Sequence, residues 1–509
     1  MTLTPTEALT RQARTRPNDT ALIFKGEVWT YRRLADEAEH VARGLAANGV
    51  KAGDRVALHM MNRPEMLVAY YACFRLGAIA APLRTAFTFA ELGPMLQRLE
   101  PALYIGESAL YPNAAPVDAA LLPKQKRILI DGADKHGARS WDVLKQADAS
   151  ADLPTPPSHE PAVLVNTSGT TGQPKFVAHT PNTLGAAAEL MSKHFNLSAD
   201  DVIVSSVAMA HASGLFTAIS FILHGVPIAV LESFDAAAVL DDVERYRGTW
   251  IFGFPNQYST LVAAQRAKRR DVSSLRGCIC GGDVCPVDLQ EQVAAILGAP
   301  LYNIWGATEV VGSVTFGLQP GPVVRILKEA QLRIVDDSGN DVANGEVGEV
   351  LIRGSNVFVG YWNDAEATAK ALEAGWYRTG DLMRRGDDDD LWFVARKKDI
   401  IIRGGTNISP MEIEEALVAC HPAVEEAAVV GKPDPVQGQR VFAFVKLAPG
   451  TKKGVVAEIR ENVAKRLASY KVPEGFQVVE ALPRNALSKV DRRALEAMAS
   501  EEKASRPAA

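Results

Sequence analysis

The chain has 509 residues, of which 47% are hydrophobic and 23% charged, and its formal net charge is −5. At ~150 residues per domain this length predicts about three folding units. The composition is that of a globular protein, which excludes a disordered, collagen-like or coiled-coil chain. The near-balance of 55 basic and 60 acidic residues argues against nucleic acid as a partner.

The sequence shows no clear pattern of a signal peptide, a transmembrane segment or a set of disulfide bonds. The N-terminus lacks the apolar segment of a signal peptide, and the most apolar stretch, 204–231, is interrupted by His211 and His224. Only twelve residues separate these histidines, fewer than the ~20 that cross a bilayer. Five cysteines do not make a disulfide framework, and Cys278 and Cys280 are expected to pack in a core strand. We therefore expect a cytoplasmic protein without a transmembrane segment.

Helical and strand patterns alternate through the first 230 residues. Apolar residues recur at helical spacing at Leu34, Ala38, Val41 and Leu45. The Asn48-Gly49 pair predicts the end of that helix, residues 55–60 predict a strand, and 64–76 predict another helix. This alternation predicts an α/β fold with two parallel-sheet subdomains covered by helices. Residues 110–160 are richer in Pro, Ala and Asp and are expected to form surface excursions.

The pattern changes in the last third of the chain. Short strands with tight turns between 331 and 399 predict a small β-rich subdomain. Ser409-Pro410 followed by Glu412 predicts a helix start, and strand and helix patterns then continue to about residue 467. We expect a large N-terminal domain, 1–396, and a small mobile α+β domain, 397–509.

A loop rich in hydroxyl and glycine residues follows the apolar run at 162–165. Hydroxyl groups, backbone N–H groups that glycine leaves accessible and a final lysine together suit the binding of phosphate groups. The loop lacks the Walker A pattern. Its residues are Thr167, Ser168, Gly169, Thr170, Thr171, Gly172, Gln173, Pro174 and Lys175.

Further motifs fall around this loop in a fixed order. They are GVKAGDRVALHMMNRPE at 49–65, YNIWGATE at 302–309, WYRTGD at 376–381, RKKD at 396–399, GGTNISPMEIE at 404–414 and LPRNALSKVDRR at 482–493. With the TSGTTGQPK loop they resemble the signatures of the adenylate-forming superfamily: acyl-CoA synthetases, beetle luciferases and peptide-synthetase adenylation domains. The resemblance covers nearly the whole chain and is strongest to the acyl-CoA synthetases. It implies a ligase that uses ATP, Mg²⁺ and coenzyme A.

The resemblance also implies residue roles, and each suits the charge of a phosphate reaction. Glu309 would bind Mg²⁺, which prefers hard oxygen ligands, and Thr308 would donate to the α-phosphate. Asp381 would accept both ribose hydroxyls, and Arg396 would support the ribose or a phosphate. The other residues expected to bind the nucleotide lie in two places. A loop beside the adenine would contain Gly281, Gly282 and Asp283, and the 302–306 segment, with Trp305 as one wall of the site, would contain Tyr302, Asn303, Trp305 and Gly306.

The C-terminal motifs imply two reactions at one site. Lys489 would bridge the incoming carboxylate and the α-phosphate as charge develops. A hinge at Lys398 would then exchange Lys489 for Gly404 and Gly405, where absent side chains let the pantetheine arm of coenzyme A pass. The family resemblance implies that His211 gates the acyl pocket. The alternative is a buried core histidine whose hydrogen bonds are satisfied and which has no role in binding.

The acid is predicted from the residues around that pocket. By the same resemblance, Gly306 would leave the pocket open, since acetate-activating relatives close it with a bulky residue at that position. The other expected lining residues are small or apolar: Ala212, Ser213, Gly214, Phe252 and Phe254. Because burying an unpaired charge is costly, we expect a hydrophobic carboxylic acid, either fatty or aromatic/alicyclic. An enzyme that passes the acyl group to a carrier protein or other acceptor is the alternative, and a non-catalytic nucleotide-binding protein is a third. A homodimer is left open.

Overall fold

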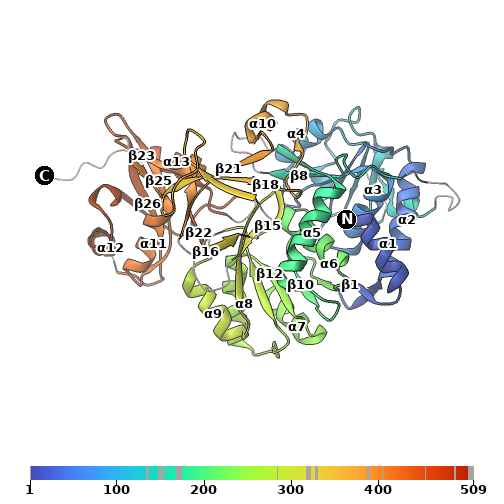
Figure 1. Ribbon diagram of the computed structural model, residues 1–509, viewed down its shortest axis with the longest axis horizontal. Helices are drawn as coiled ribbons and strands as arrows, with labels where there is room; N and C mark the ends of the chain where they lie inside the picture. Colours follow the sequence, from blue (N-terminus) through green and yellow to red (C-terminus); the bar gives the residue numbers. More distant parts are fainter. Residues whose placement is uncertain are drawn as a thin grey trace. The chain divides into compact units, whose positions relative to one another are not determined.

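The computed structural model describes residues 2–132, 137–146, 153, 155–167, 175–283, 285–316, 323–326, 331–386, 390–404, 406–452, 454–485 and 489–501, with the side chains of 312–316 and 323–326 excepted. The chain forms two compact units (Figure 1). Unit 1 comprises Met1–Leu332 and Ile352–Arg378, and unit 2 comprises Arg333–Leu351 and Thr379–Ala509. Unit 2 thus begins earlier in the chain than the expected 397–509 domain, and the position of the hinge stays a prediction.

Unit 1 contains an eight-stranded sheet built largely from its N-terminal half. Strands β3, β4, β5, β6, β7 and β8 run parallel to their neighbours, whereas β8 and β9 form an antiparallel pair. The spatial order is β19 (Gly360–Tyr361), β9 (Lys175–His179), β8 (Val163–Thr167), β4 (Ile79–Pro82), β3 (Arg55–His59), β5 (Leu103–Gly106), β6 (Arg127–Leu129) and β7 (Arg139–Ser140).

A second sheet completes unit 1. Its central strands are parallel, and antiparallel strands lie at both ends. The order within the unit is β16 (Val323–Ile326), β15 (Val310–Phe316), β14 (Leu301–Ala307), β13 (Gly277–Cys280), β12 (Trp250–Gly253), β10 (Ile203–Ser205), β11 (Ile228–Val230), β1 (Thr20–Phe24) and β2 (Glu27–Thr30). The two parallel-sheet subdomains expected from the sequence are confirmed.

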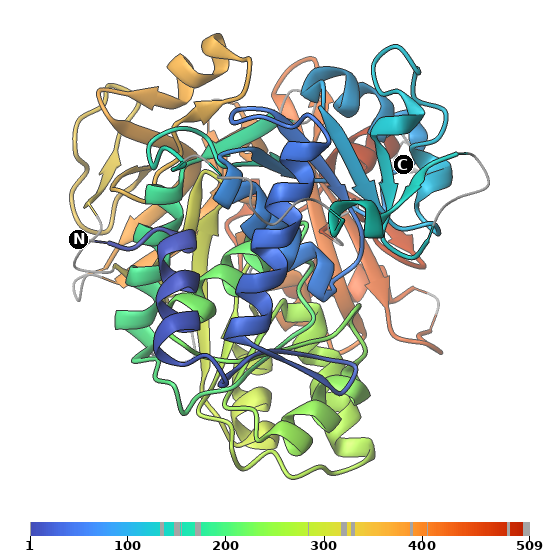
Figure 2. The same cartoon turned by 90° about the vertical axis from the view of Figure 1, so that its right-hand side faces the viewer.

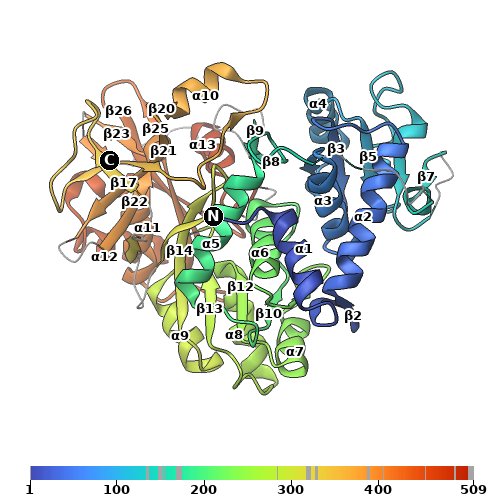
Figure 3. The same cartoon turned by 45° about the vertical axis from the view of Figure 1, so that its right-hand side comes forward.

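Helices separate and cover the two sheets, giving five layers. α1 (Pro5–Thr15), α2 (Tyr31–Ala47), α3 (Pro64–Leu76), α5 (Pro181–Phe195) and α6 (Ala212–Leu223) form the layer associated with both sheets. α4 (Phe89–Leu99) covers the outer face of the first sheet, and α7 (Ala236–Tyr246), α8 (Pro255–Ala267) and α9 (Val287–Leu297) cover that of the second. Figure 2 shows α1 beside α2, and Figure 3 shows α8 and α9 against β12 and β13.

The inner layer explains the apolar patterns of the sequence. Along α3 every residue is buried except Glu65 and Arg75, because sheets or helices lie on nearly all sides of it. Strand β3 alternates: Val56 and Leu58 face the inner helices, whereas Ala57 packs in the outer cluster with α4. The predicted helix 64–76 and strand near 55–60 are confirmed.

Residues 110–144 are not the surface excursion that their composition suggests. Tyr111 and Leu122 are buried, and strands β6 and β7 extend the first sheet. Arg127 holds the segment: its guanidinium, with the residue 3% exposed, donates to the carbonyl oxygens of Ala115, Val117 and Leu122 at 2.8–2.9 Å. One buried cation therefore satisfies loop carbonyls that would otherwise be desolvated without partners.

Unit 2 is β-rich and then α+β. The sequence predicts both patterns, but it places the β-rich part in the N-terminal domain. One sheet has the order β17 (Gln331–Val335), β18 (Val347–Arg353), β21 (Trp376–Arg385) and β22 (Asp390–Arg396). A second has the order β24 (Thr406–Ile408), β23 (Ile401–Arg403), β26 (Gly438–Leu447) and β25 (Val424–Asp434), with β27 (Gly475–Val479) beside β26. Its helices are α11 (Pro410–Cys420), α12 (Val455–Ala464) and α13 (Arg492–Glu501).

Two local predictions are also confirmed. Ser409 caps α11 by accepting a hydrogen bond from the backbone N–H of Glu412. Cys278 and Cys280 are fully buried in β13, within the core beneath α8 and α9. Over the part of the chain that the structure describes, no helix is both long and apolar enough to span a bilayer.

Candidate functional site

The predicted phosphate loop joins two antiparallel strands rather than a strand and a helix. Thr167 ends β8 and Lys175 begins β9, and the two residues are cross-strand partners. Both ends of the loop are therefore fixed at one edge of the first sheet. Ser168, Gly169, Thr170, Thr171 and Gly172 lie outside the described residues.

Thr308 and Glu309 form the tight turn between β14 and β15, with Ala307 paired to Val310 across it. A two-residue hairpin turn presents both side chains with little backbone freedom. The turn is tied to β9 of the other sheet, since His179 Nε2 donates to the Thr308 carbonyl oxygen at 2.8 Å. Burial lowers the pKa of His179 to about 4, so its imidazole is neutral at pH 7.

Tyr361 lies between the loop and the turn. Its hydroxyl donates to Glu309 Oε1 at 2.8 Å, and Lys175 Nζ lies 4.7 Å from the centroid of its ring. Burial, and then the Glu309 carboxylate, raise the pKa of Tyr361 above its usual range, which keeps the hydroxyl protonated as a donor. The structure thus brings the predicted phosphate lysine to the ring face of one tyrosine and the predicted metal ligand to its hydroxyl.

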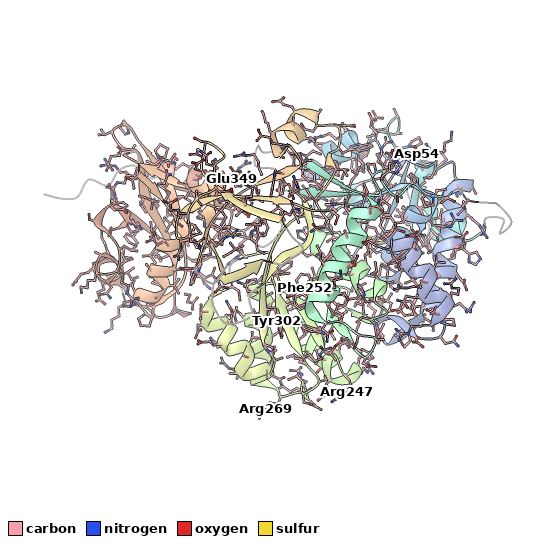
Figure 4. The ribbon with its side chains drawn as sticks, in the orientation of Figure 1. Asp54, Arg247, Phe252, Arg269, Tyr302 and Glu349 are labelled. Atoms are coloured by element: carbon pink, nitrogen blue, oxygen red, sulfur yellow. The ribbon has the colours of Figure 1, made fainter. Side chains whose placement is uncertain are left out.

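Residues expected near adenine and the acyl group lie on the strand ends of the second sheet. Gly281 and Gly282 follow β13, and a Cβ at Gly282, which has φ +81°, would lie 2.9 Å from the Phe254 ring, so backbone conformation and packing both favour glycine here. Asp283 is exposed. Phe252 is 3% exposed on β12, and Figure 4 labels it together with Tyr302 of the same sheet.

The residues of β14 differ in their surroundings. The ring of Tyr302 packs against Phe195 and Trp250, with centroids 5.5 and 5.8 Å away, so this side chain belongs to an aromatic cluster. Asn303 is 8% exposed, whereas Gly306 is exposed. Trp305 is half-buried between them. Nucleotide contacts of these residues stay predictions.

His211 is the N-cap of α6. Its Nδ1 accepts the backbone N–H of Ser213 at 3.3 Å, and its ring packs edge-on against Phe254, with centroids 6.4 Å apart. Ala212 follows it as the first residue of the helix, and Gly214 approaches the backbone closely: a Cβ there would lie 2.1 Å from the Ala208 carbonyl oxygen. The structure therefore brings His211 and Phe254 together as predicted neighbours.

In unit 2, Asp381 and Arg396 are cross-strand partners in β21 and β22. Asp381 is 5% exposed, and its Oδ1 lies 3.4 Å from Arg396 Nε. Its backbone N–H donates to Thr379 Oγ1 at 3.0 Å. A buried carboxylate beside a half-exposed guanidinium suits the predicted pair of ribose ligands.

Lys398 lies in a single turn of 3₁₀ helix, 397–399, directly after β22. Gly404 has φ +55°, a left-handed conformation that favours glycine, whereas Gly405 lies outside the described residues. Lys489 closes a short loop, since Asn485 and Lys489 exchange hydrogen bonds: the Lys489 carbonyl accepts at 2.8 Å and its N–H donates to Asn485 Oδ1 at 3.3 Å.

Sequence reasoning missed Tyr361 and His179. Their hydrogen-bond partners, Glu309 and Thr308, are 52 and 129 residues away in the chain, so no local pattern shows these contacts. The available signal was positional: His179 lies four residues after Lys175, so it faces the same side of β9 and leads directly into α5.

Comparisons with known proteins identify the family of this chain. The family model described as AMP-binding enzyme matches residues 9–362, and that of the AMP-binding enzyme C-terminal domain matches 412–489. An indoleacetate–CoA ligase of Aromatoleum aromaticum is 34% identical over 95% of this chain and 96% of its own length. The medium-chain fatty-acid–CoA ligase of Escherichia coli is 32% identical over 94% of this chain and 88% of its own.

Solved structures give the same result. An anthranilate CoA ligase in complex with anthranoyl-AMP superposes with a TM-score of 0.89 at 25% identity, over 98% of each chain. The o-succinylbenzoate coenzyme A synthetase of Bacillus subtilis, in complex with ATP and magnesium ion, gives 0.84 at 27% identity, over 96% of this chain and 99% of its own. The chain therefore belongs to the AMP-binding enzyme family, as an enzyme of its AMP-forming acid–CoA ligases.

Proposed function

We propose that this ligase activates a hydrophobic monocarboxylic acid, fatty or aromatic/alicyclic, and transfers it to coenzyme A. The observation that carries the proposal is the contact between the Phe254 ring and the His211 ring at the start of α6, with the buried Phe252 two residues before Phe254. Neither 212–223 nor 250–260 contains a Lys, Arg, Asp or Glu that could pair with a charged tail. Relatives that act on indoleacetate, feruloyl and fatty acyl groups support this class.

In the first step a carboxylate oxygen attacks the α-phosphorus of ATP, and the bond from that phosphorus to the β-phosphate oxygen breaks to release pyrophosphate. The 167–175 loop binds the leaving phosphates, and Thr308 donates to the α-phosphate. Glu309 suits Mg²⁺, because Tyr361 occupies only one of its oxygens and leaves hard oxygen lone pairs for a cation. Mg²⁺ bound there would neutralise charge on the phosphates. Lys489 bridges the carboxylate and the α-phosphate as that charge develops.

In the second step the coenzyme A thiolate attacks the acyl carbonyl carbon, the carbon–oxygen bond to phosphate breaks, and AMP leaves. A hinge at Lys398 withdraws Lys489 and brings Gly404 and Gly405 to the site. The ribose stays bound through Asp381 and Arg396, whose ion pair fixes the carboxylate. Both steps therefore use one nucleotide site in turn.

The test is an acid panel with ATP, Mg²⁺ and coenzyme A, with acyl-CoA products identified by mass spectrometry. The panel contains medium and long fatty acids, arylacetic and cinnamic acids, and the dicarboxylates malonate and succinate. We expect products from at least one hydrophobic class, with kcat/KM at least about a hundredfold above that for either dicarboxylate, because a buried unpaired carboxylate costs several kcal/mol. A dicarboxylate as the best substrate would refute the proposal.

A further inference from the structure

Tyr361 connects two parts of unit 1 that the ligase reaction must coordinate. It lies in β19, a two-residue strand that pairs with β9 through Gly360 to Ala178 and Tyr361 to Val177. Its ring has two polar neighbours from different segments: Lys175 at the end of the phosphate loop, and Glu309 in the hairpin turn between β14 and β15. The two neighbours have opposite charges and contact different parts of the same side chain.

The contact with Glu309 fixes the orientation of its carboxylate. Tyr361 Oη donates to Oε1 at 2.8 Å, which leaves Oε2 and one lone pair of Oε1 for a cation. Outer partners of this kind hold a ligating carboxylate in one rotamer, and their loss typically weakens metal binding by about 10- to 100-fold. The free carboxylate of Glu309 would otherwise sample several rotamers in the turn.

The contact with Lys175 uses the ring face rather than the hydroxyl. The ammonium lies 4.7 Å from the ring centroid, within the range of a cation–π interaction. Lys175 is also fixed at its backbone as the cross-strand partner of Thr167. The long side chain of Lys175 is thereby directed along the tyrosine ring instead of moving freely in solvent.

The backbone around Tyr361 is fixed on both sides. The N–H of Phe358 donates to the Glu309 carbonyl at 2.8 Å, and the N–H of Trp362 donates to the Phe176 carbonyl at 2.8 Å. One short segment is therefore hydrogen-bonded to the hairpin turn and to β9. Moving Tyr361 relative to either would break backbone hydrogen bonds, so its side chain has a defined place between Lys175 and Glu309.

We propose that Tyr361 is a positioning residue that sets Glu309 for Mg²⁺ through its hydroxyl and sets Lys175 for the leaving phosphates through its ring face. The inference rests on the proposed function in taking Glu309 as the metal ligand. The inference assigns two separate roles to one side chain: the hydroxyl controls the affinity for Mg²⁺, and the ring controls the affinity for the nucleotide. If Tyr361 had only a packing role, removing its hydroxyl would not change the affinity for Mg²⁺ separately from the affinity for ATP.

The test separates hydroxyl from ring by comparing Tyr361→Phe with Tyr361→Leu. ATP binding is measured by calorimetry at a series of Mg²⁺ concentrations, without acid or coenzyme A. Tyr361→Phe is expected to raise the Mg²⁺ concentration for half-maximal ATP binding by about tenfold or more, while ATP affinity at saturating Mg²⁺ stays within about twofold. Tyr361→Leu is expected also to weaken ATP binding at saturating Mg²⁺ by about two- to fivefold. Tyr246→Phe, in α7, is the matched control and should match wild type.

A double-mutant cycle keeps the test independent of small effects on folding. Glu309→Gln alone should raise the Mg²⁺ requirement, and adding Tyr361→Phe to it should change that requirement by less than about twofold. If the fold-increase in the Mg²⁺ requirement of the double variant equalled the product of the two single fold-increases, the residues would act independently and the inference would be overturned. A Mg²⁺ requirement of Tyr361→Phe equal to that of wild type would also overturn it. Wild-type ATP binding that is insensitive to Mg²⁺ would instead remove Glu309 as a metal ligand and overturn the inference, whereas the acid class in the proposed function is tested separately by the acid panel.

Discussion

Gly214 is the position where one added methyl group should do the most damage to the acyl side of the site. A Cβ there would lie 2.1 Å from the carbonyl oxygen of Ala208 and 2.7 Å from the backbone nitrogen of Met209. The obstacle is backbone, and it cannot retreat freely. Asn62 accepts the N–H of Met209 at 2.7 Å, and Tyr70 donates to the Met209 carbonyl at 2.8 Å.

The magnitude follows from these contacts. Overpacking a close-packed site costs about 1–3 kcal/mol, and each hydrogen bond broken to relieve it adds about 1 kcal/mol. We expect Gly214→Ala to destabilise unit 1 by about 2–5 kcal/mol. Because the displaced segment leads into His211, the KM for the acid should rise while the KM for ATP changes little.

The assay is thermal unfolding combined with steady-state kinetics. Gly386→Ala is the matched control, since its nearest heavy atoms would be 3.6 Å or more from the new Cβ. The control should keep the wild-type midpoint and both KM values. A Gly214→Ala protein that melts within about 1 °C of wild type, with an unchanged KM for the acid, would refute the packing argument.

Three further predictions concern other parts of the chain. Lys489→Ala should slow ATP–pyrophosphate exchange by about 10²–10³-fold while leaving thioester formation from supplied acyl-AMP intact. Lys465→Ala, at an exposed position, is the control, and unchanged exchange in Lys489→Ala would contradict the role of Lys489. Arg127→Met should lower the free energy of unfolding by about 3–5 kcal/mol in denaturant titrations, because buried carbonyls of 115–122 lose their donor; a loss under about 1 kcal/mol would contradict this. Burial lowers the pKa of His59 and His179 to about 4 from 6.5, so the unfolded chain binds protons that the folded chain does not between these values. Stability present above pH 6.5 is therefore lost as pH falls toward 4, by about 3 kcal/mol per histidine over the whole window, and equal melting midpoints at pH 7 and pH 5 would contradict it.

The sequence predicts those parts of the fold whose signals are local. The helix 64–76 and the strand that begins at Arg55 follow from periodicity, and the start of α11 follows from the capping side chain of Ser409. The prediction for 110–144 is wrong because composition indicates exposed turns, whereas the segment is held by one buried arginine that satisfies the carbonyls of Ala115 and Leu122. Composition carries no information about such a tertiary partner.

For the site, too, local signals are predictable from the sequence and contacts between distant residues are not. Ordered motifs identify Lys175, Glu309 and Asp381 as residues with chemistry, because their types and order suit an ATP site. They do not show that Tyr361 lies between Lys175 and Glu309, since that contact needs β19 to pair with β9 across more than 180 residues of chain. Nor do they show that Tyr302 packs on Phe195 and Trp250.

The central claim is that acyl transfer to coenzyme A completes the reaction of this ligase. The most direct measurement is the rate of AMP release from ATP, Mg²⁺ and the best acid of the panel, with and without coenzyme A. We predict that sustained AMP release requires coenzyme A and that AMP, pyrophosphate and acyl-CoA form in equal amounts. AMP release at the same rate without coenzyme A, or with acyl transfer only to a carrier protein or an amine, would contradict it.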